Sequence, residues 1–348
     1  MLKERALLVG GVNLPGAEAV FRAVAAEAGD VVERIPDGET DARNDWIVAQ
    51  IPVLRRQAQL EPGEPFTNEY RSHPRWKIRD GVEPDEIELG SLGYTDAATD
   101  SYRIFTRLKR EGVIRSDTRF QVSLPTPLAV VGVFIDPRDA LRFEPVYERH
   151  MLGEMAAIAE IVPHGELAFQ WDAAIEFFML EGFWSGYFPG DLLTGLVERT
   201  ARMIDAIPTD VQAGLHLCYG DSEGKHFKEP EDAAYLAAMA TGVLSAVHRS
   251  LDWLHLPVPI ERDDEAYFAP LADLELPAGT TLYLGLLHKE DGLEGARRRI
   301  AAARAYVPEF GVATECGMSR DATPEEIPGL LRLHAEVARE LEAAAASV

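Results

Sequence analysis

The stretch Gly214-Leu215-His216-Leu217-Cys218-Tyr219-Gly220-Asp221 is an apolar run that ends in a His-x-Cys pattern. The first and third side chains of an extended strand point to the same side, so His216 and Cys218 can bind one ion together. The other cysteine of the chain, Cys316, also follows an apolar run, in Thr314-Glu315-Cys316-Gly317-Met318-Ser319-Arg320. One imidazole and two thiolates form a zinc-type ligand set. The alternative is two buried structural cysteines and a histidine at the end of a strand.

Around this stretch the chain alternates short β-rich apolar runs with longer helical runs, which is typical of βα units around a parallel sheet. We expect strands at residues 6–10, 31–35, 119–124, 167–172, 211–218, 253–260, 281–287 and 312–315. The expected helices include residues 15–28, 45–59, 101–111, 192–206, 232–249, 293–306 and 324–345. Eight such units predict an α/β fold, a closed (β/α)8 TIM barrel that spans residues 1–348 as one domain. Residues 60–100 contain several prolines and scattered charge, which indicates an irregular excursion from the barrel.

The composition limits the class of partner and the compartment. The net charge of −24 argues against nucleic acid and anionic membranes as partners. No apolar stretch approaches the roughly eighteen residues of a membrane span, and the N-terminus lacks the layout of a signal peptide. The chain has 2 cysteines on separate expected strands, which does not suggest a disulfide framework. We therefore expect a cytoplasmic protein, and a homo-oligomer is compatible with the sequence.

The active site of such a barrel lies at the C-terminal ends of its strands, and polar residues collect there. They are Glu39, Asp172, His216, Cys218, Glu261, His288 and Cys316. For Glu39 and Asp172 the alternative is a helix N-cap or a solvated loop carboxylate, and for His288 it is a hydrogen-bonded residue of the rim. His255 alternates with Trp253 and Pro257 in its expected strand, which is compatible with a side chain facing the barrel interior. An aromatic group after the fourth expected strand would either wall an apolar pocket or pack in the core; its members are Phe177, Phe178, Phe183, Trp184, Tyr187 and Phe188.

The motifs of the chain resemble the C-terminal catalytic barrel of cobalamin-independent methionine synthase, within the wider uroporphyrinogen decarboxylase and methionine synthase-like superfamily. The specific part is His216-Leu217-Cys218-Tyr219 with Glu315-Cys316-Gly317-x-x-Arg320. Gly38-Glu39 followed by Arg43-Asn44-Asp45 is similar to the Gly-Glu-x-x-x-Arg-Asn-Asp run of that family. Gln170-Trp171-Asp172 resembles its Gln-Ile-Asp-Glu-Pro strand end, and Val9-Gly10-Gly11 stands where the family has Ile-Gly-Ser. The resemblance covers nearly the whole chain, which would be a single-barrel relative.

The resemblance implies the roles of individual residues. Zn2+ would be held by His216, Cys218, Cys316 and, as a fourth and weaker ligand, Glu261, for which Asp263 or Asp264 could substitute. Glu39 and Asp172 would bind the amino group of the acceptor, and the Gly10-Gly11 strand end its carboxylate, although Gly11 lacks the hydroxyl of the family's serine. His288 would be the acid that protonates the leaving group of the donor.

The implied activity is that of a zinc-dependent transferase that activates a thiol for methyl or other alkyl transfer. Its partners would be a small-molecule thiol and an alkyl donor. The chain departs from the family where the pterin donor binds, because Ala173-Ala174 replaces Glu-Pro and Ser123-Leu124-Pro125-Thr126-Pro127 replaces a tryptophan-bearing segment. A C–S bond lyase or demethylase, and an epoxide:thiol alkyltransferase, use the same kind of site. A decarboxylase on the same barrel needs no zinc-thiolate set, and a non-catalytic zinc protein would have four tight ligands and no adjoining pocket.

Overall fold

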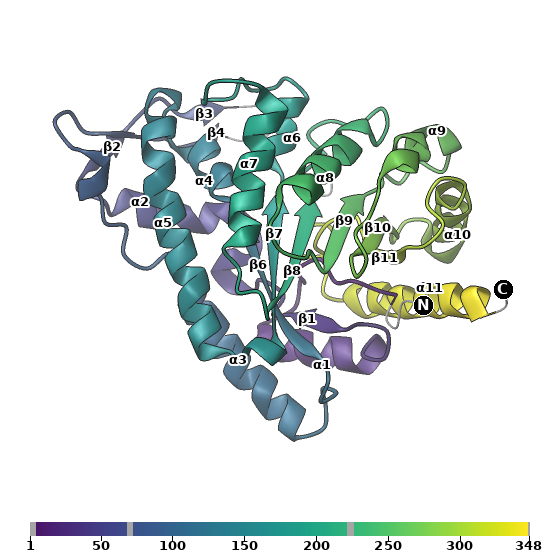
Figure 1. Cartoon of the computed structure of the whole chain (residues 1–348). Coiled ribbons are helices and arrows are strands. Elements are labelled where there is room, and N and C mark those ends of the chain that lie inside the picture. The colour runs from purple at the N-terminus through teal and green to yellow at the C-terminus, as the bar shows by residue number, and fades with distance from the viewer. Residues whose placement is uncertain (1–4, 68–71, 221–225, 347–348) are drawn as a thin grey trace.

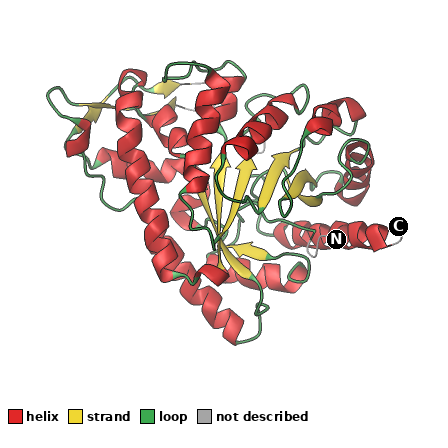
Figure 2. Ribbon diagram, in the orientation of Figure 1, coloured by secondary structure: helices red, strands yellow, loops and turns green. Residues whose placement is uncertain are grey.

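The computed structural model describes residues 5–67, 72–220 and 226–346. Its centre is a curled sheet of parallel strands surrounded by helices (Figures 1 and 2). The strand order is β1-β6-β7-β8-β9-β10-β11, so each strand pairs with the next one along the chain within this sheet. The strands are β1 Arg34–Pro36, β6 Arg119–Pro125, β7 Leu167–Ala173, β8 Gln212–Leu217, β9 Trp253–Pro257, β10 Thr281–Leu287 and β11 Gly311–Thr314. The predicted parallel α/β architecture is confirmed.

The first expected strand, residues 6–10, is an extended segment that contains only an isolated bridge residue. Ala6 bridges both Val32, just before β1, and Val312 in β11, and Leu7 N–H donates to the Val312 carbonyl at 2.9 Å. The segment therefore lies between the two edge strands of the seven-stranded sheet, as in a TIM-like barrel. A few bridge contacts, among them that of Val12 with Met318, thus take the place of the ladder expected for an eighth strand.

Helices cover the outside of the sheet, and most of them follow a strand as the sequence pattern indicated. They are α1 Ala17–Glu27, α3 Tyr94–Arg110, α4 Pro127–Phe134, α5 Pro137–Ile161, α6 Ile175–Leu180, α7 Leu192–Asp205, α8 Ala234–Ala246, α9 Glu265–Phe268, α10 Gly292–Ala303 and α11 Ile327–Ala346. Helix α3 begins seven residues before the expected start at residue 101. The buried Glu154 of α5 accepts hydrogen bonds from the backbone N–H groups of Leu92 and Thr95, both at 2.6 Å. This remote carboxylate supplies the N-terminal cap that the local sequence lacks.

The prediction of one continuous helix over residues 45–59 is wrong, because only a short part of this range is α-helical. The chain forms a 3-10 segment, η1 Asp41–Gln50, and a short helix, α2 Ile51–Arg55. Trp46 has a φ of 47° and a ψ of −117°, which interrupts any helix at this point. This backbone is uncommon for a bulky residue, and Trp46 lines the cavity at the carboxyl ends of the strands, which we call the main cavity because it contains most of the candidate site residues. The backbone conformation that places Trp46 at the cavity is therefore incompatible with a continuous helix here.

The excursion predicted for residues 60–100 is present at one side of the molecule, near α2 and α5 (Figure 1). It contains two small antiparallel ladders, β2 Leu60–Pro62 with β5 Trp76–Ile78 and β3 Phe66–Thr67 with β4 Ser72–His73. Residues 68–71 of this excursion, and Asp221, lie outside the described residues. The Ile78 N–H donates to the Asp139 carboxylate of α5 at 2.9 Å, which ties the excursion to the helix layer. In the part of the chain that is described, no helix has the length and apolar character needed to cross a membrane.

Candidate metal and substrate site

One cavity of about 170 Å³ opens at the carboxyl ends of the strands and continues towards the excursion. It brings together seven of the nine residues singled out from the sequence. They are Gly10, Gly11, Glu39, Asp172, His216, Cys218 and Cys316. The two that do not line it are Glu261 and His288. The cavity is therefore the candidate active site, at the place that a parallel α/β barrel provides for it.

The imidazole and the two thiols lie close enough to share an ion. One ligand atom each of His216, Cys218 and Cys316 falls within 4.8 Å of the others. The two sulfur atoms are 3.6 Å apart, and they do not form a disulfide. Two sulfurs bound at about 2.3 Å to a tetrahedral zinc ion would be separated by about 3.8 Å. The observed spacing fits a shared metal. The hydrogen bond with the Cys316 sulfur, and then burial, raises the pKa of the Cys218 thiol well above its usual value.

The histidine of this group also has the free nitrogen that a metal needs. His216 Nδ1 lies 2.6 Å from His255 Nδ1, whereas His216 Nε2 is buried without a hydrogen-bond partner. If His216 donates its Nδ1–H to His255, the Nε2 lone pair is available to an ion. Burial, and then the nearby His255, lowers the pKa of His216 well below its usual value, so the ring is neutral as a ligand must be. The register of β8 and β9 places these two histidines opposite each other.

Glu261, the predicted fourth ligand, is not brought into this group. Its side chain is exposed in the turn after β9, and it does not line the cavity. The two aspartates considered as substitutes are engaged elsewhere: Asp263 accepts a hydrogen bond from Arg298, and Asp264 caps α9. Among the described residues, the group of three therefore leaves one side of the candidate ion towards the cavity. The role of Glu261 stays a prediction.

Glu39 and Asp172 form an acidic pair in the same cavity. Burial, opposed by Arg43 and reinforced by the charge of Asp37, raises the pKa of Glu39 to about 7. Burial and the charge of Glu39 raise the pKa of Asp172 well above its usual range. Gln170 donates to Asp172 at 2.8 Å, because Trp253 Nε1–H donates at 3.1 Å to the amide oxygen of the same Gln170 and so fixes the orientation of the amide.

The backbone around Glu39 is adapted to bring its carboxylate into the cavity. Glu39 has a φ of 48° and follows Gly38 with a φ of 83°. Its N–H donates to Asp37 Oδ1 at 3.0 Å, and Asp37 is paired with Arg43. A Cβ atom at Gly10 would collide with Glu39 Oε1, so the absence of a side chain at Gly10 lets the carboxylate approach the strand end.

The resemblance predicts a serine hydroxyl at the position of Gly11, and the hydroxyl of Ser319 lies beside this position. A Cβ atom at Gly11 would lie 2.5 Å from Ser319 Oγ, and Ser319 also lines the cavity. The Met318 N–H donates to the Gly11 carbonyl at 2.6 Å, which holds the two segments together. The sequence analysis missed Ser319, because the two positions are far apart in the chain and only the fold places them in contact.

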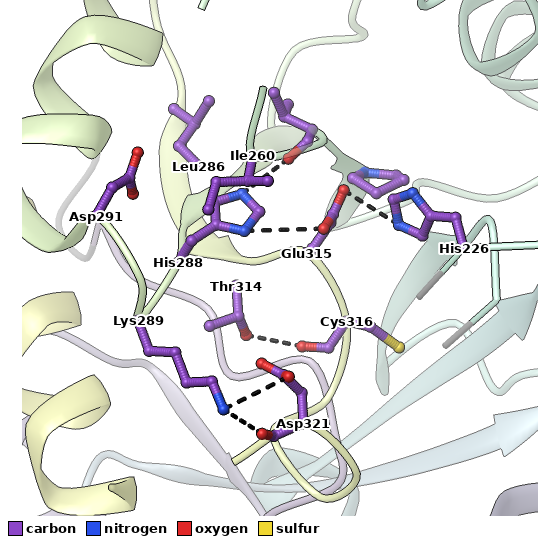
Figure 3. A network of polar contacts seen from close by, with 12 residues as sticks. His226, Ile260, Leu286, His288, Lys289, Asp291, Thr314, Glu315, Cys316 and Asp321 are labelled. Carbon is purple, nitrogen blue, oxygen red and sulfur yellow. Dashed lines mark hydrogen bonds and ion pairs between the residues drawn. The ribbon is translucent and has the colours of Figure 1, made fainter. Parts of the chain in front are cut away.

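His288 lies in a neighbouring cavity of about 300 Å³, separated from the main one by the chain at Cys316 and Gly317. Its Nε2 atom donates to the Val258 carbonyl at 2.9 Å, and its Nδ1 atom lies 3.8 Å from Glu315 Oε2. Figure 3 shows His288 and His226 approaching the Glu315 carboxylate from opposite sides. Burial, and then the charge of Arg299, lowers the pKa of His288 to about 4, whereas hydrogen bonds to Glu229 and Glu315 outweigh burial and raise the pKa of His226 to about 10. The acid role of His288 stays a prediction, and His226 is a residue of this network that the sequence did not indicate.

The geometry defines a parallel α/β protein with a candidate metal-ligand set at its strand ends. Solved structures that share the fold include the following three. A B12-independent methionine synthase from Shewanella sp. W3-18-1, in complex with selenomethionine, is 12% identical with a TM-score of 0.60, and the match covers 100% of both chains. A putative vitamin-B12-independent methionine synthase from Listeria monocytogenes is 14% identical with a TM-score of 0.54, over 98% of this chain and 99% of that one. A methyltransferase from Methanosarcina mazei is 12% identical with a TM-score of 0.50, over 99% and 95%.

No family model matches the sequence, and no curated protein matches it. Identities of this size show a common fold. The resemblance to methionine synthase-like proteins that the sequence predicted is therefore confirmed at the level of the fold and of the length of the chain.

Proposed function

We propose that the protein is a zinc-dependent methyl- or alkyltransferase whose acceptor is a thiol. The observation that carries the proposal is the group of His216, Cys218 and Cys316, with ligand atoms within 4.8 Å of one another on the wall of the main cavity. The fold shared with methionine synthases and a methyltransferase supports the reaction class. We likewise infer that residues 1–348 form one barrel domain, with the extended segment at residues 6–12 in the place of the eighth strand.

These three residues would hold the ion, and the chemistry of a bound Zn2+ would be to keep the acceptor sulfur as a thiolate at neutral pH. A free thiol has a pKa of about 8.5 and is mostly protonated at pH 7. The adjoining cavity supports a catalytic site over a purely structural one, which would be closed by four protein ligands.

The residues of the chain would orient the acceptor. Glu39 and Asp172 offer carboxylates to an ammonium group, and the Ser319 hydroxyl beside Gly11 offers a donor to an acceptor carboxylate. In the transfer, the thiolate sulfur attacks the alkyl carbon of the donor, and a C–S bond forms as the bond to the leaving group breaks. The leaving group departs with the electron pair and takes up one proton, which balances the proton that the thiol has lost. We assign no residue as the donor of this proton, because His288 lies in the neighbouring cavity.

Metal analysis with thiol binding tests the proposal. We expect about one zinc ion per chain in the parent protein and none in a Cys218→Ser, Cys316→Ser double variant. His216→Ala should lose zinc, whereas His248→Ala, a control at an exposed side chain that pairs with Asp205, should keep it. Zinc-edge X-ray absorption with homocysteine, cysteine and simpler thiols should then show one additional zinc–sulfur bond. Trace metal in the parent, or no new bond with any thiol, would contradict the proposed function.

A further inference from the structure

The main cavity has a second, apolar part whose wall consists of aromatic side chains from separate segments. Phe66 comes from β3, Phe178 from α6, Trp184 from the loop after α6, and Phe227 from the loop after β8. Phe178 stacks on Phe227 with ring centres 3.7 Å apart and on Trp184 at 5.2 Å. Trp184 meets Phe66 edge to face at 4.8 Å. We call these four residues the aromatic wall.

The aromatic wall lies next to the candidate metal site. Gly220, two residues after Cys218, lines the same cavity, and a Cβ atom there would lie 3.5 Å from Phe227 and 3.9 Å from Phe178. Gly220 also has a φ of 76°, which an ordinary residue rarely adopts. The chain leaving the Cys218 ligand therefore passes directly against the wall. A molecule packed on the wall would lie in the same cavity as Cys218 and Cys316.

The four residues of the aromatic wall carry no charge themselves, whereas the charged residues Glu39, Asp45, Asp172 and Arg320 line the same cavity. Among the described lining residues, Arg320 is the one arginine or lysine, and its charge acts on Glu39 and Asp172. Arg75, which lies 5.0 Å over the Phe66 ring, donates to the carbonyls of Val133 and Gly132 and does not line the cavity. The wall thus offers mainly aromatic faces, and the ionisable side chain that lies against it inside the cavity is His73, whose ring lies parallel to that of Phe66 at 6.4 Å.

The size of the cavity further restricts the ligand. Its volume of about 170 Å³ is close to the roughly 150 Å³ of an apolar protein cavity that accommodates benzene. A single ring fits such a space, and its quadrupole favours the stacked and edge-to-face contacts that Phe178 and Trp184 can provide. The same volume includes the space beside the candidate metal ligands, so the part at the aromatic wall suits a small aromatic molecule better than a large one.

Resting on the proposed function, we propose that the alkyl donor is a neutral aryl alkyl ether, bound with its ring on the aromatic wall. The acceptor thiolate attacks the alkyl carbon, so that the C–S bond forms and the C–O bond breaks. The phenolate oxygen leaves with the electron pair and is protonated, which consumes the equivalent of the proton lost by the thiol. The products are an alkyl thioether and a phenol, and no oxidant or reductant is needed.

The test uses zinc-loaded protein and two probes that differ in one charge, anisole and 4-methoxybenzoate. We expect saturable binding of anisole in ligand-observed NMR, at least about tenfold weaker binding of 4-methoxybenzoate, and about a tenfold loss of anisole affinity in Trp184→Ala. Tyr235→Ala, which removes an exposed aromatic ring on α8, should leave anisole affinity unchanged. With a thiol present, anisole should also yield phenol and the methyl thioether in equal amounts.

Zinc content and thiol binding are measured on the same preparations, which separates the two proposals. Protein that binds zinc and thiol, but binds 4-methoxybenzoate as well as anisole or shows no effect of Trp184→Ala, would overturn the donor assignment alone. If Trp184→Ala does not fold, anisole affinity is measured in Phe178→Leu, which removes another ring of the wall but keeps an apolar side chain. Protein that binds neither zinc nor thiol would overturn the proposed function, whatever its affinity for anisole.

Discussion

Replacing Glu39 with Gln should make the protein more stable at pH 8 relative to the parent, while leaving the two nearly equal near pH 4.5. The pKa of Glu39 is raised from 4.5 to about 7 in the folded protein, chiefly by burial. Below pH 4.5 the carboxyl group is protonated in both the folded and the unfolded chain, so it contributes no difference. Between pH 4.5 and 7 only the unfolded chain ionises, and the free energy of unfolding falls as the pH rises. Above pH 7 the folded protein holds a buried negative charge at its full cost.

The size of the effect follows from the pKa values. One pH unit corresponds to about 1.4 kcal/mol, so a pKa raised from 4.5 to about 7 gives a cost of up to about 3 kcal/mol. Solvent reaches the half-buried Glu39 side chain, which reduces the expected gain of Glu39→Gln to about 1–3 kcal/mol at pH 8. Glu39→Gln has a second effect that also stabilises the folded protein. Removing the Glu39 charge relieves the repulsion that raises the pKa of Asp172.

Urea unfolding of metal-free protein at several pH values measures this effect. Glu336→Gln makes the same chemical change at an exposed position of α11 and serves as the control. A stability difference between Glu39→Gln and the parent that does not change between pH 5 and pH 8 would refute the burial argument. The same titration should appear in binding, since an ammonium acceptor favours the ionised pair: parent affinity should rise from pH 6 to pH 8, and Glu39→Gln should lose that rise.

Two further perturbations test the neighbouring contacts. His255→Phe removes the partner of His216 Nδ1, so zinc affinity measured by chelator competition should fall about 10- to 100-fold without loss of helical circular dichroism; an unchanged affinity would exclude His255 as a positioning residue. Gly11→Ser places a side chain where Ser319 Oγ lies 2.5 Å away, and should cost about 1–3 kcal/mol in urea unfolding. Adding Ser319→Gly should recover most of that loss, and a purely additive double variant would show that the two residues do not compete for one space.

The sequence predicted the parts of this structure that depend on local pattern. Strand β10 begins and ends at the expected residues, and β6 to β9 lie within a few residues of their expected ranges. The His-x-Cys alternation placed two candidate ligands on one side of the chain at the end of β8, because side-chain direction in a strand follows a strict period of two. The cavity position of Glu39 and Asp172 followed from the rule that parallel strands present their carboxyl ends at the same face.

The rest depends on contacts between segments far apart in the chain, and His255 and Ser319 show why. Strand alternation was compatible with a His255 side chain facing the interior, but its partner is set by the β8–β9 register, which no local pattern encodes. Ser319 reaches Gly11 only because Met318 bridges Val12 across the two ends of the chain. In both cases a residue that the sequence singled out is contacted by a second residue that the sequence did not indicate as part of the site. Two kinds of residue therefore indicate where an additional site residue should be sought in the folded chain. One is a glycine at a position where the resembling family has a serine, as at Gly11, and the other is a candidate metal-binding histidine whose second ring nitrogen needs a hydrogen-bond partner, as in His216.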